Sequence, residues 1–470
     1  MIQINHTLSP SDLRPKLERF WQRSAECLDA IEAKFPVGSE TPVLTVDGQY
    51  QARGWTEWTQ GFQYGAHFLQ FDATGELRFF DQACQRTVDS MASHLTHVGV
   101  HDHGFNNVST YGNWWRLMNE GRVAESTWQR NFCELALKVT GAVQASRWAV
   151  TREGSGYIYS FNGPQSLFVD TIRSCRALAL SHQLGHVLMG EQDVKINLLE
   201  CLVEHACNTA RYNIWYGESR DSYDIRGRTA HESIFNAAAS GEYRCPSTQQ
   251  GYSPFSTWTR GLAWAMLGYP EQLEWLQTVA DEELEAAGGR ANIEATFLEA
   301  ARATCDFYLE HTPTCGVPYW DTGAPGLSQL GDYLSRAADP YNEHEPVDSS
   351  AAAIAAQGLL RLGQYLEARG EVDDAARYRQ AGLTVLDTLL GDPYLSSDPN
   401  HQGLLLHSIY HRPNGWDYVP EGQRVPCGES SMWGDYHARE LAVYVGRLAQ
   451  GETYHTFFGP TAASSQSVTS

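Results

Sequence analysis

Helical periodicity runs through almost the whole chain of 470 residues, and it constrains the fold more than any other feature. Apolar residues recur at the three- and four-residue spacing of amphipathic helices, and the sequence lacks a convincing alternating run of strand type. The pattern predicts an all-α protein, with a first helix over residues 9–35 that Ser9 and Pro10 begin. Further helices are expected at 59–71, 77–97, 105–118, 122–145, 166–184, 190–212, 257–268, 271–286, 290–311, 347–369, 371–390 and 430–449.

The expected helices are of two kinds. The run from Ala351 to Ala356 carries small residues on nearly every side, which is typical of helices that crowd together. The segment 371–390 has one apolar face and one charged face, the latter with Glu371 and Arg377. We therefore expect an inner ring of small-residue helices and an outer ring of amphipathic ones.

Long connections between these helices hold an unusual share of the aromatic, His, Gly and Pro residues. Loops of this length in a compact domain are more often functional than idle. They lie at 98–115, 151–166, 212–259, 312–346 and 393–433, and we expect a binding site where they gather.

A formal net charge of −22 excludes most polyanionic partners. The field of such a protein repels nucleic acid and anionic membrane surfaces. The sequence contains no apolar run long enough for a membrane span, and its first residues lack the features of a secretory signal. Ten cysteines are scattered without a CxxC pair, which favours reduced thiols and a cytoplasmic location. Nothing in the sequence indicates the number of subunits.

The most informative segment runs from Gln250 to Trp264 and reads Gln-Gly-Tyr-Ser-Pro-Phe-Ser-Thr-Trp-Thr-Arg-Gly-Leu-Ala-Trp. Arg260 and Trp264 are four residues apart and share one helix face, with Trp258 at its start. Indole rings stack on pyranose rings, and a guanidinium binds a carboxylate, so the motif suits a sugar acid. A structural arginine held by core tryptophans fits this motif, taken alone, equally well.

In this segment the chain resembles glycoside hydrolase family 88, the unsaturated glucuronyl hydrolases, and more distantly the unsaturated rhamnogalacturonyl hydrolases of family 105. The resemblance continues in the family's order at 316–321, 348–356 and 433–436. It implies an (α/α)6 barrel, a six-hairpin toroid, as a single catalytic domain over residues 1–459, followed by a tail at 460–470 that we expect to be disordered. It also implies that the enzyme removes a 4,5-unsaturated uronic acid from the non-reducing end of lyase-generated oligosaccharides, without a cofactor.

Two aspartates lie in segments similar to those of the family. Asp102 is in His101-Asp102-His103-Gly104-Phe105, and Asp170 is in Leu167-Phe168-Val169-Asp170-Thr171. The resemblance implies that Asp170 is the general acid and base and that Asp102 is its hydrogen-bonding partner. Taken singly, each is more often a helix cap. Burial under aromatic rings and the like charge of Asp102 lead us to expect a raised pKa for Asp170.

The resemblance also suggests a set of substrate-binding residues. Any one of the histidines could instead be structural, and the sequence holds no HExxH or close Cys/His pairing, so we expect no metal. Gln63 and Phe161 stand where the family commonly has tryptophan, and extra length near 212–248 and 410–430 leaves the aglycone specificity open. The expected binding residues are His101, His205, His231, Gln250, Trp258, Arg260, Trp264, Trp58 and Tyr436.

Four other functions remain compatible with the sequence. The first is an unsaturated rhamnogalacturonyl hydrolase, which differs only in the aglycone. The others are an ordinary inverting glucosidase with two separated carboxyls, a sugar epimerase or isomerase on the same barrel, and a carbohydrate-binding protein without activity.

Overall fold

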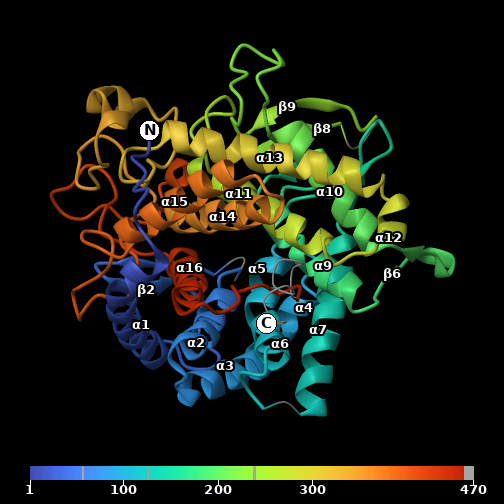
Figure 1. The fold of residues 1–470 in the computed structure, drawn as a ribbon, viewed down its shortest axis with the longest axis horizontal. Coiled ribbons are helices and arrows are strands. Elements are labelled where there is room, and N and C mark those ends of the chain that lie inside the picture. The colour runs from blue at the N-terminus through green and yellow to red at the C-terminus, as the bar shows by residue number, and fades with distance from the viewer. Residues whose placement is uncertain (55–57, 125, 237–239, 460–470) are drawn as a thin grey trace.

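The computed structural model describes residues 1–54, 58–124, 126–236 and 240–459 of the chain (Figure 1). The expected tail at 460–470 lies outside these residues. Helix predominates in the described part, as the periodicity predicted. The helices are α1 (Arg14–Lys34), α2 (Gln60–Thr74), α3 (Leu77–Ser90), α4 (Ala92–Leu95), α5 (His103–Asn107), α6 (Asn113–Asn119), α7 (Thr127–Ala145), α8 (Thr171–Ser174), α9 (Arg176–Gln183), α10 (Leu198–Asn213), α11 (Thr259–Leu276), α12 (Asp281–Glu285), α13 (Arg290–His311), α14 (Ser349–Ala368), α15 (Val372–Leu389) and α16 (Met432–Gln450), and a π-helical turn, η2 (Val108–Gly112), joins α5 to α6.

Short strands, which the periodicity did not predict, occur in the connections between helices. All their pairings are antiparallel, and β5, β8 and β9 form a three-stranded sheet in that order. The strands are β1 (Pro42–Val46), β2 (Gln49–Ala52), β3 (Trp148–Val150), β4 (Gly156–Ile158), β5 (Ser166–Phe168), β6 (Leu188–Met189), β7 (Lys195–Ile196), β8 (Glu232–Phe235) and β9 (Tyr243–Ser247).

The helices form two rings, one inside the other. In the inner ring α2 packs on α5 and η2, α5 on α8, α8 on α11, α11 on α14, α14 on α16, and α16 back on α2. Outside this ring, α1 and α3 pack on α2, α13 packs on α11, and α15 packs on α14. The outer helices α7 and α10 pack on α9, which directly follows α8. Figure 1 shows α16, in red, between the blue N-terminal helices and the orange α14 and α15, so the two ends of the chain close the ring.

The two expected kinds of helix are found in the two expected places. In the inner helix α14 every residue from Ser349 to Gly363 is buried. Its outer partner α15 buries only a stripe that includes Ala375, Tyr378 and Leu386. Inner helices also approach one another through glycine: a methyl group at Gly104 of α5 would overlap the backbone of Ser174 in α8.

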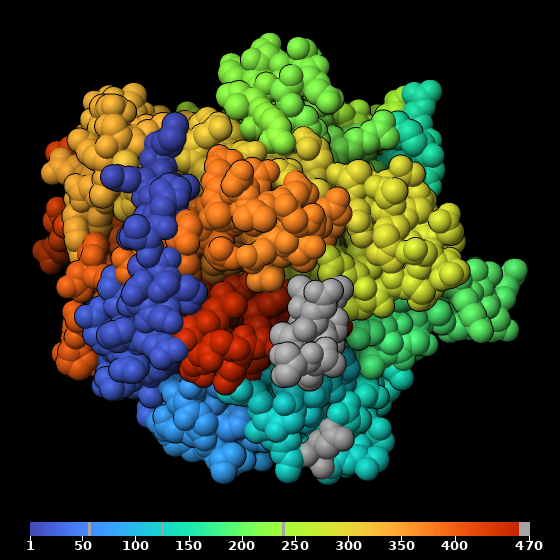
Figure 2. All heavy atoms as spheres, in the orientation of Figure 1, coloured from blue at the N-terminus to red at the C-terminus, as the bar shows by residue number. Residues whose placement is uncertain are grey.

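Some predicted boundaries were wrong. Two helices were expected at 257–268 and 271–286, yet α11 continues through Pro270 to Leu276. Every residue of α11 is buried, so packing outweighs the cost of a proline within the helix. Pro270 has no N–H to donate to the Met266 carbonyl, and this carbonyl lies against Gly358 of α14. The helix expected at 190–212 begins only at Leu198, because residues 188–196 form the β6–β7 hairpin, which projects at the right of Figure 2.

One buried carboxylate joins the first and last helices of the inner ring. Asp72 of α2 is 3% exposed, and its oxygens lie 2.8 Å from guanidinium nitrogens of Arg116 in α6, Arg122 and Arg447 in α16. Burial alone would raise the pKa of Asp72, but the three arginines outweigh it and hold this pKa below its usual value. No helix in the described residues has both the length and the apolar character needed to cross a membrane.

We expect Asp72→Ala to lower the free energy of unfolding by about 3–5 kcal/mol, because the buried Arg116 and Arg447 then share the single carboxylate of Glu120 as counter-charge. Urea unfolding followed by circular dichroism measures this. The matched control is Asp29→Ala, which removes a carboxylate that is 51% exposed and paired with Arg78 at the surface, and it should cost only a small fraction of that amount. Equal stabilities of the two variants would contradict this account of ring closure.

Candidate active site

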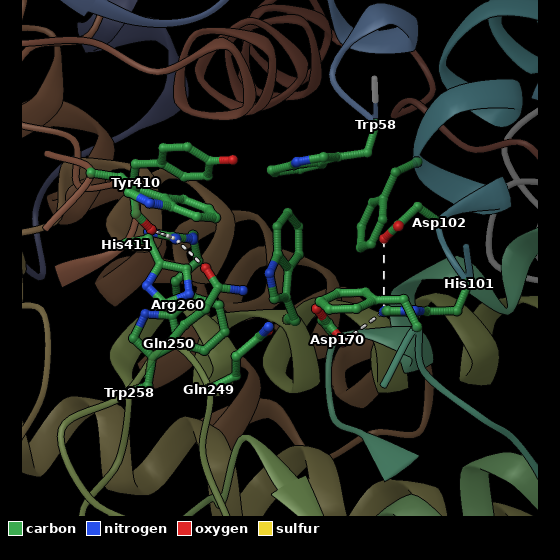
Figure 3. A pocket seen from close by; sticks show the side chains of 14 residues that line it. Trp58, His101, Asp102, Asp170, Gln249, Gln250, Trp258, Arg260, Tyr410 and His411 are labelled. Carbon is green, nitrogen blue, oxygen red and sulfur yellow. Dashed lines mark hydrogen bonds and ion pairs between the residues drawn. The ribbon is translucent and has the colours of Figure 1, made fainter. Parts of the chain in front are cut away.

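A pocket opens where several inner helices begin, and the long loops form its rim. It encloses about 610 Å³, mouth included, and most of its wall is aromatic. Asp102 and Asp170 directly precede α5 and α8, and Trp258 directly precedes α11. The lining residues are Trp58, His101, Asp102, Phe105, Phe161, Asp170, Gln249, Gln250, Trp258, Arg260, Trp264, Tyr410, His411 and Trp416 (Figure 3).

The two aspartates are not used as helix caps. Neither carboxylate bonds the backbone of the helix that follows it, and each residue is 8% exposed. Between them lies His101, whose Nε2 is 3.5 Å from Asp170 Oδ1 and 3.8 Å from Asp102 Oδ1 (Figure 3). The structure thus brings both expected carboxyls into the pocket, and the group that lies near both is an imidazole.

The expected raised pKa of Asp170 is wrong for this structure. Burial raises the pKa of Asp170, but the charge of His101, whose Nε2 lies 3.5 Å away, outweighs it and leaves this pKa below its usual value. Burial raises the pKa of Asp102, and the charge of Asp170 adds to the rise against the opposing charge of His101. The sequence argument considered the like charge of the two aspartates and left out the imidazole between them.

Arg260 lines the pocket, but its guanidinium is already engaged. Nη1 donates to Asp348 Oδ2 at 2.6 Å and to the Ile409 carbonyl, while Nη2 donates to the Tyr410 carbonyl at 2.7 Å and to Gln250 Oε1 at 3.1 Å. The guanidinium also lies over the Trp258 ring, 4.6 Å from its centroid. The structure therefore shows Arg260 binding a carboxylate of the protein, and it fixes the loop at 409–410 and the Gln250 amide.

His231 lies behind the pocket wall and supports it. Its Nδ1 accepts hydrogen bonds from the backbone N–H groups of Gln249 at 3.0 Å and Gln250 at 3.3 Å, and its ring meets Trp258 edge-on at 4.7 Å. Burial lowers the pKa of His231 to about 4, against the opposing charge of Asp170. A neutral His231 thus holds the segment that presents both glutamines.

Three expected binding residues do not line the pocket: His231, His205 and Tyr436. His205 is fully buried, and its Nδ1 accepts from the Ile158 backbone at 3.1 Å. The Tyr436 hydroxyl accepts from Asn113 Nδ2 at 3.0 Å and donates to Glu440 at 3.3 Å, inside the barrel. The remaining expected residues all contribute to the wall, and Trp58 stacks on Trp433 with a centroid separation of 4.9 Å.

Six lining residues were not among the expected site residues: Gln249, Phe105, Phe161, Tyr410, His411 and Trp416. The Asp417 carboxylate accepts from the backbone N–H groups of Tyr410 and His411 and so fixes their loop. Trp416 packs at 4.9 Å from the His411 ring and 5.3 Å from the Tyr410 ring. The only sequence signal for this part of the wall was that Trp416 lies in the extra length near 410–430. No group of three or more potential metal ligands was found within the described residues.

Known proteins resemble this chain over most of its length, although no protein-family model matches it. An unsaturated glucuronyl hydrolase of Formosa agariphila is 24% identical over 387 residues, 82% of this chain and 78% of the relative. Another, from Bacillus sp. strain GL1, is 26% identical over 412 residues, 85% and 89% of the two chains. An unsaturated chondroitin disaccharide hydrolase of Streptococcus pyogenes is 24% identical over 443 residues, 92% and 91% of the two chains.

Solved structures of such enzymes have the same fold. The Bacillus sp. GL1 unsaturated glucuronyl hydrolase gives a TM-score of 0.69 at 21% identity and covers 94% of this chain and 100% of its own. One specific for heparin gives 0.69 at 18% identity and covers 93% and 100%. The (α/α)6 barrel and the resemblance to unsaturated glucuronyl hydrolases, both inferred from the sequence, are thereby confirmed.

We expect Arg260→Ala to lower the free energy of unfolding by about 3–5 kcal/mol without any ligand, because Asp348 is then buried without a counter-charge. Thermal and urea unfolding of the unliganded protein measure this. Arg152→Ala, which removes a surface pair with Glu242, is the matched control and should change stability little. An Arg260→Ala protein as stable as the unsubstituted chain would restore a ligand-binding role as the main task of this arginine.

Proposed function

We propose that this chain is a glycoside hydrolase that removes a 4,5-unsaturated uronic acid from the non-reducing end of an oligosaccharide. Two findings support the proposal together: the similarity to hydrolases of this kind over more than four-fifths of the chain, and a pocket with two buried carboxyls. The pocket carries the argument, because Asp102 and Asp170 face one cavity with aromatic walls that suit a sugar ring.

The reaction needs an acid and a base, and it does not attack the anomeric carbon. A 4,5-unsaturated uronic acid is a vinyl ether, so a proton delivered to C4 produces oxocarbenium character at C5. Water adds to C5 and gives up a proton, and the resulting hemiketal opens and releases the aglycone. Ordinary retaining and inverting glycosidases attack C1 instead.

In this proposal Asp170 protonates C4 and then accepts the proton of the attacking water, and Asp102 is its electrostatic partner. Trp58, Trp258 and Trp264 provide aromatic faces for the sugar. Because Arg260 is engaged by Asp348, neutral donors such as the amides of Gln249 and Gln250 are left to receive the sugar carboxylate.

Substrate and setting are further parts of the proposal. A mutant of the Streptococcus agalactiae unsaturated glucuronyl hydrolase has been solved with dGlcA-GalNAc6S, which supports an unsaturated oligosaccharide as partner here. All ten cysteines are free thiols, which supports a reducing, cytoplasmic setting. We propose residues 1–459 as one catalytic domain.

We expect Asp170→Asn to reduce turnover by a factor of about a hundred to ten thousand while the protein stays folded, because the amide cannot donate the proton. The loss of ultraviolet absorbance of the conjugated double bond in lyase-made disaccharides follows the reaction. Asp332→Asn, at an exposed position, is the matched control and should keep full activity. A variant at position 170 that retained a tenth of the activity would overturn the assignment.

The same assay separates the proposal from its rivals. An epimerase or a carbohydrate-binding protein would leave the double bond intact, and an ordinary glucosidase would not need it. Products from chondroitin, heparin, hyaluronan, ulvan, xanthan and pectin, run in parallel, identify the parent polymer, and preference for the pectin product would favour the rhamnogalacturonyl type.

A further inference from the structure

His101 is enclosed more completely than a sugar-binding residue needs to be. It is 1% exposed, and its ring stacks on Phe161 at 5.6 Å and meets Phe168 edge-on at 5.4 Å. In the part of the chain that the structure describes, neither ring nitrogen makes a hydrogen bond, although Nε2 lies 3.5 Å from Asp170 Oδ1. A buried imidazole with two unsatisfied nitrogens is costly, so the polar groups around it must explain its presence.

Asp102 and Asp170 are the negative groups that face this ring. The other titratable groups near it are Arg147, His205 and His231. The Arg147 guanidinium donates to the carbonyls of Val98, Tyr159 and Ser160, and burial lowers the pKa of His205 to about 3 and that of His231 to about 4. Two buried carboxylates thus face one imidazole among neutral histidines and an arginine that is already bonded.

An imidazolium matches the negative charge of the two facing carboxylates better than a neutral ring does. As a cation, His101 places its Nε2–H between Asp170 Oδ1 and Asp102 Oδ1, at 3.5 and 3.8 Å, distances that can shorten when a substrate closes the site. Burial lowers the pKa of His101, but the charges of Asp102 and Asp170 outweigh it and raise this pKa above its usual value.

We propose that His101 is a positioning residue that stores, between its Nε2 and the carboxylate of Asp170, the proton that Asp170 delivers to C4. This inference rests on the proposed function. The proton passes from Nε2 to Asp170 Oδ1, and from there to C4, where the π electrons of the alkene form the C–H bond. The water that adds to C5 returns one proton to Asp170 and so to His101, and the cycle balances without any co-reactant.

A proton held on His101 explains how Asp170 can act as an acid although the pKa of Asp170 itself is low. The imidazolium holds the proton in the resting enzyme, and Asp102 keeps the imidazolium charged and oriented. Asp102 therefore acts on Asp170 through His101 in the resting enzyme.

Histidine NMR of the unliganded protein tests the charge of His101 without any substrate. In protein labelled with ¹³C at histidine Cε1, we expect a resonance that stays protonated above the pH at which an ordinary histidine loses its proton, and that disappears in His101→Gln. His94→Gln is the matched control, because His94 is also buried nearby but bonds Gln60 Oε1 at 2.8 Å and has a pKa lowered to about 4 by burial. A resonance of His101 that is neutral throughout the neutral range would overturn the proposal.

The pH dependence of turnover tests the role of the stored proton. In the unsubstituted enzyme activity is lost as pH rises through the raised pKa of His101. In His101→Gln only the carboxyls can hold the proton, so the alkaline limb of the kcat profile should move to lower pH by at least about one unit. We expect kcat at neutral pH to fall by a factor of about ten to a hundred, with a change in KM of less than about threefold.

The outcomes of the two measurements are distinct. A sugar-binding role for His101 would raise KM and leave the alkaline limb in place, which would contradict the proposal. A protein that fails to cleave every unsaturated disaccharide would overturn the proposed function, while the NMR titration would still decide the charge of His101.

Discussion

Charges buried between neighbouring helices must be paired, and this requirement governs the inner ring. A buried ion without its partner costs several kcal/mol, so each pair fixes how two helices meet. Asp72 joins α2 to α6 and α16 in this way. Farther inside, Arg173 of α8 lies 2.8 Å from Glu271 of α11 and 2.7 Å from Glu440 of α16. Small residues let the inner helices approach closely, and these ion pairs hold them in register.

The same requirement decides what the pocket can offer to a substrate. Arg260 lines the pocket, but Asp348 and two backbone carbonyls already satisfy it. Its task is to hold the loop at 409–410, and through that loop the wall formed by Tyr410 and its neighbours. The cation that remains at the chemical centre is the imidazolium of His101, buried against two carboxylates.

Much of the fold could be read from the sequence, because small-residue and amphipathic helices differ in composition. Ala351 to Ala356 identified an inner helix, and the segment 371–390 an outer one. Boundaries that depend on tertiary packing could not be read. Pro270 is a helix breaker by its own chemistry, and only the burial of α11 on all sides and the close approach of Gly358 keep that helix continuous.

The candidate site divides in the same way. Motifs located Asp102, Asp170 and the tryptophans, because the chemistry requires those residue types. The roles of the other expected residues depend on partners that are far away in the sequence. Arg260, expected to contact the ligand, instead forms a structural ion pair with Asp348. The Tyr436 hydroxyl bonds Glu440 and Asn113 inside the barrel and does not reach the pocket. No periodicity or spacing indicates that His101 lies between two carboxylates, so the pKa of Asp170 could not be inferred from the sequence.

An anionic substrate entering this pocket meets a protein of net charge −22 and two buried aspartates. Each negative charge added near Asp170 favours protonation there, since like charges raise the pKa of a carboxyl. A uronate carboxylate that binds closer to Asp170 than to the His101 ring would therefore draw the proton from His101 toward Asp170. Binding and activation of the acid then have one electrostatic cause, and the net negative charge of the protein helps to keep a proton in the pocket until the alkene receives it.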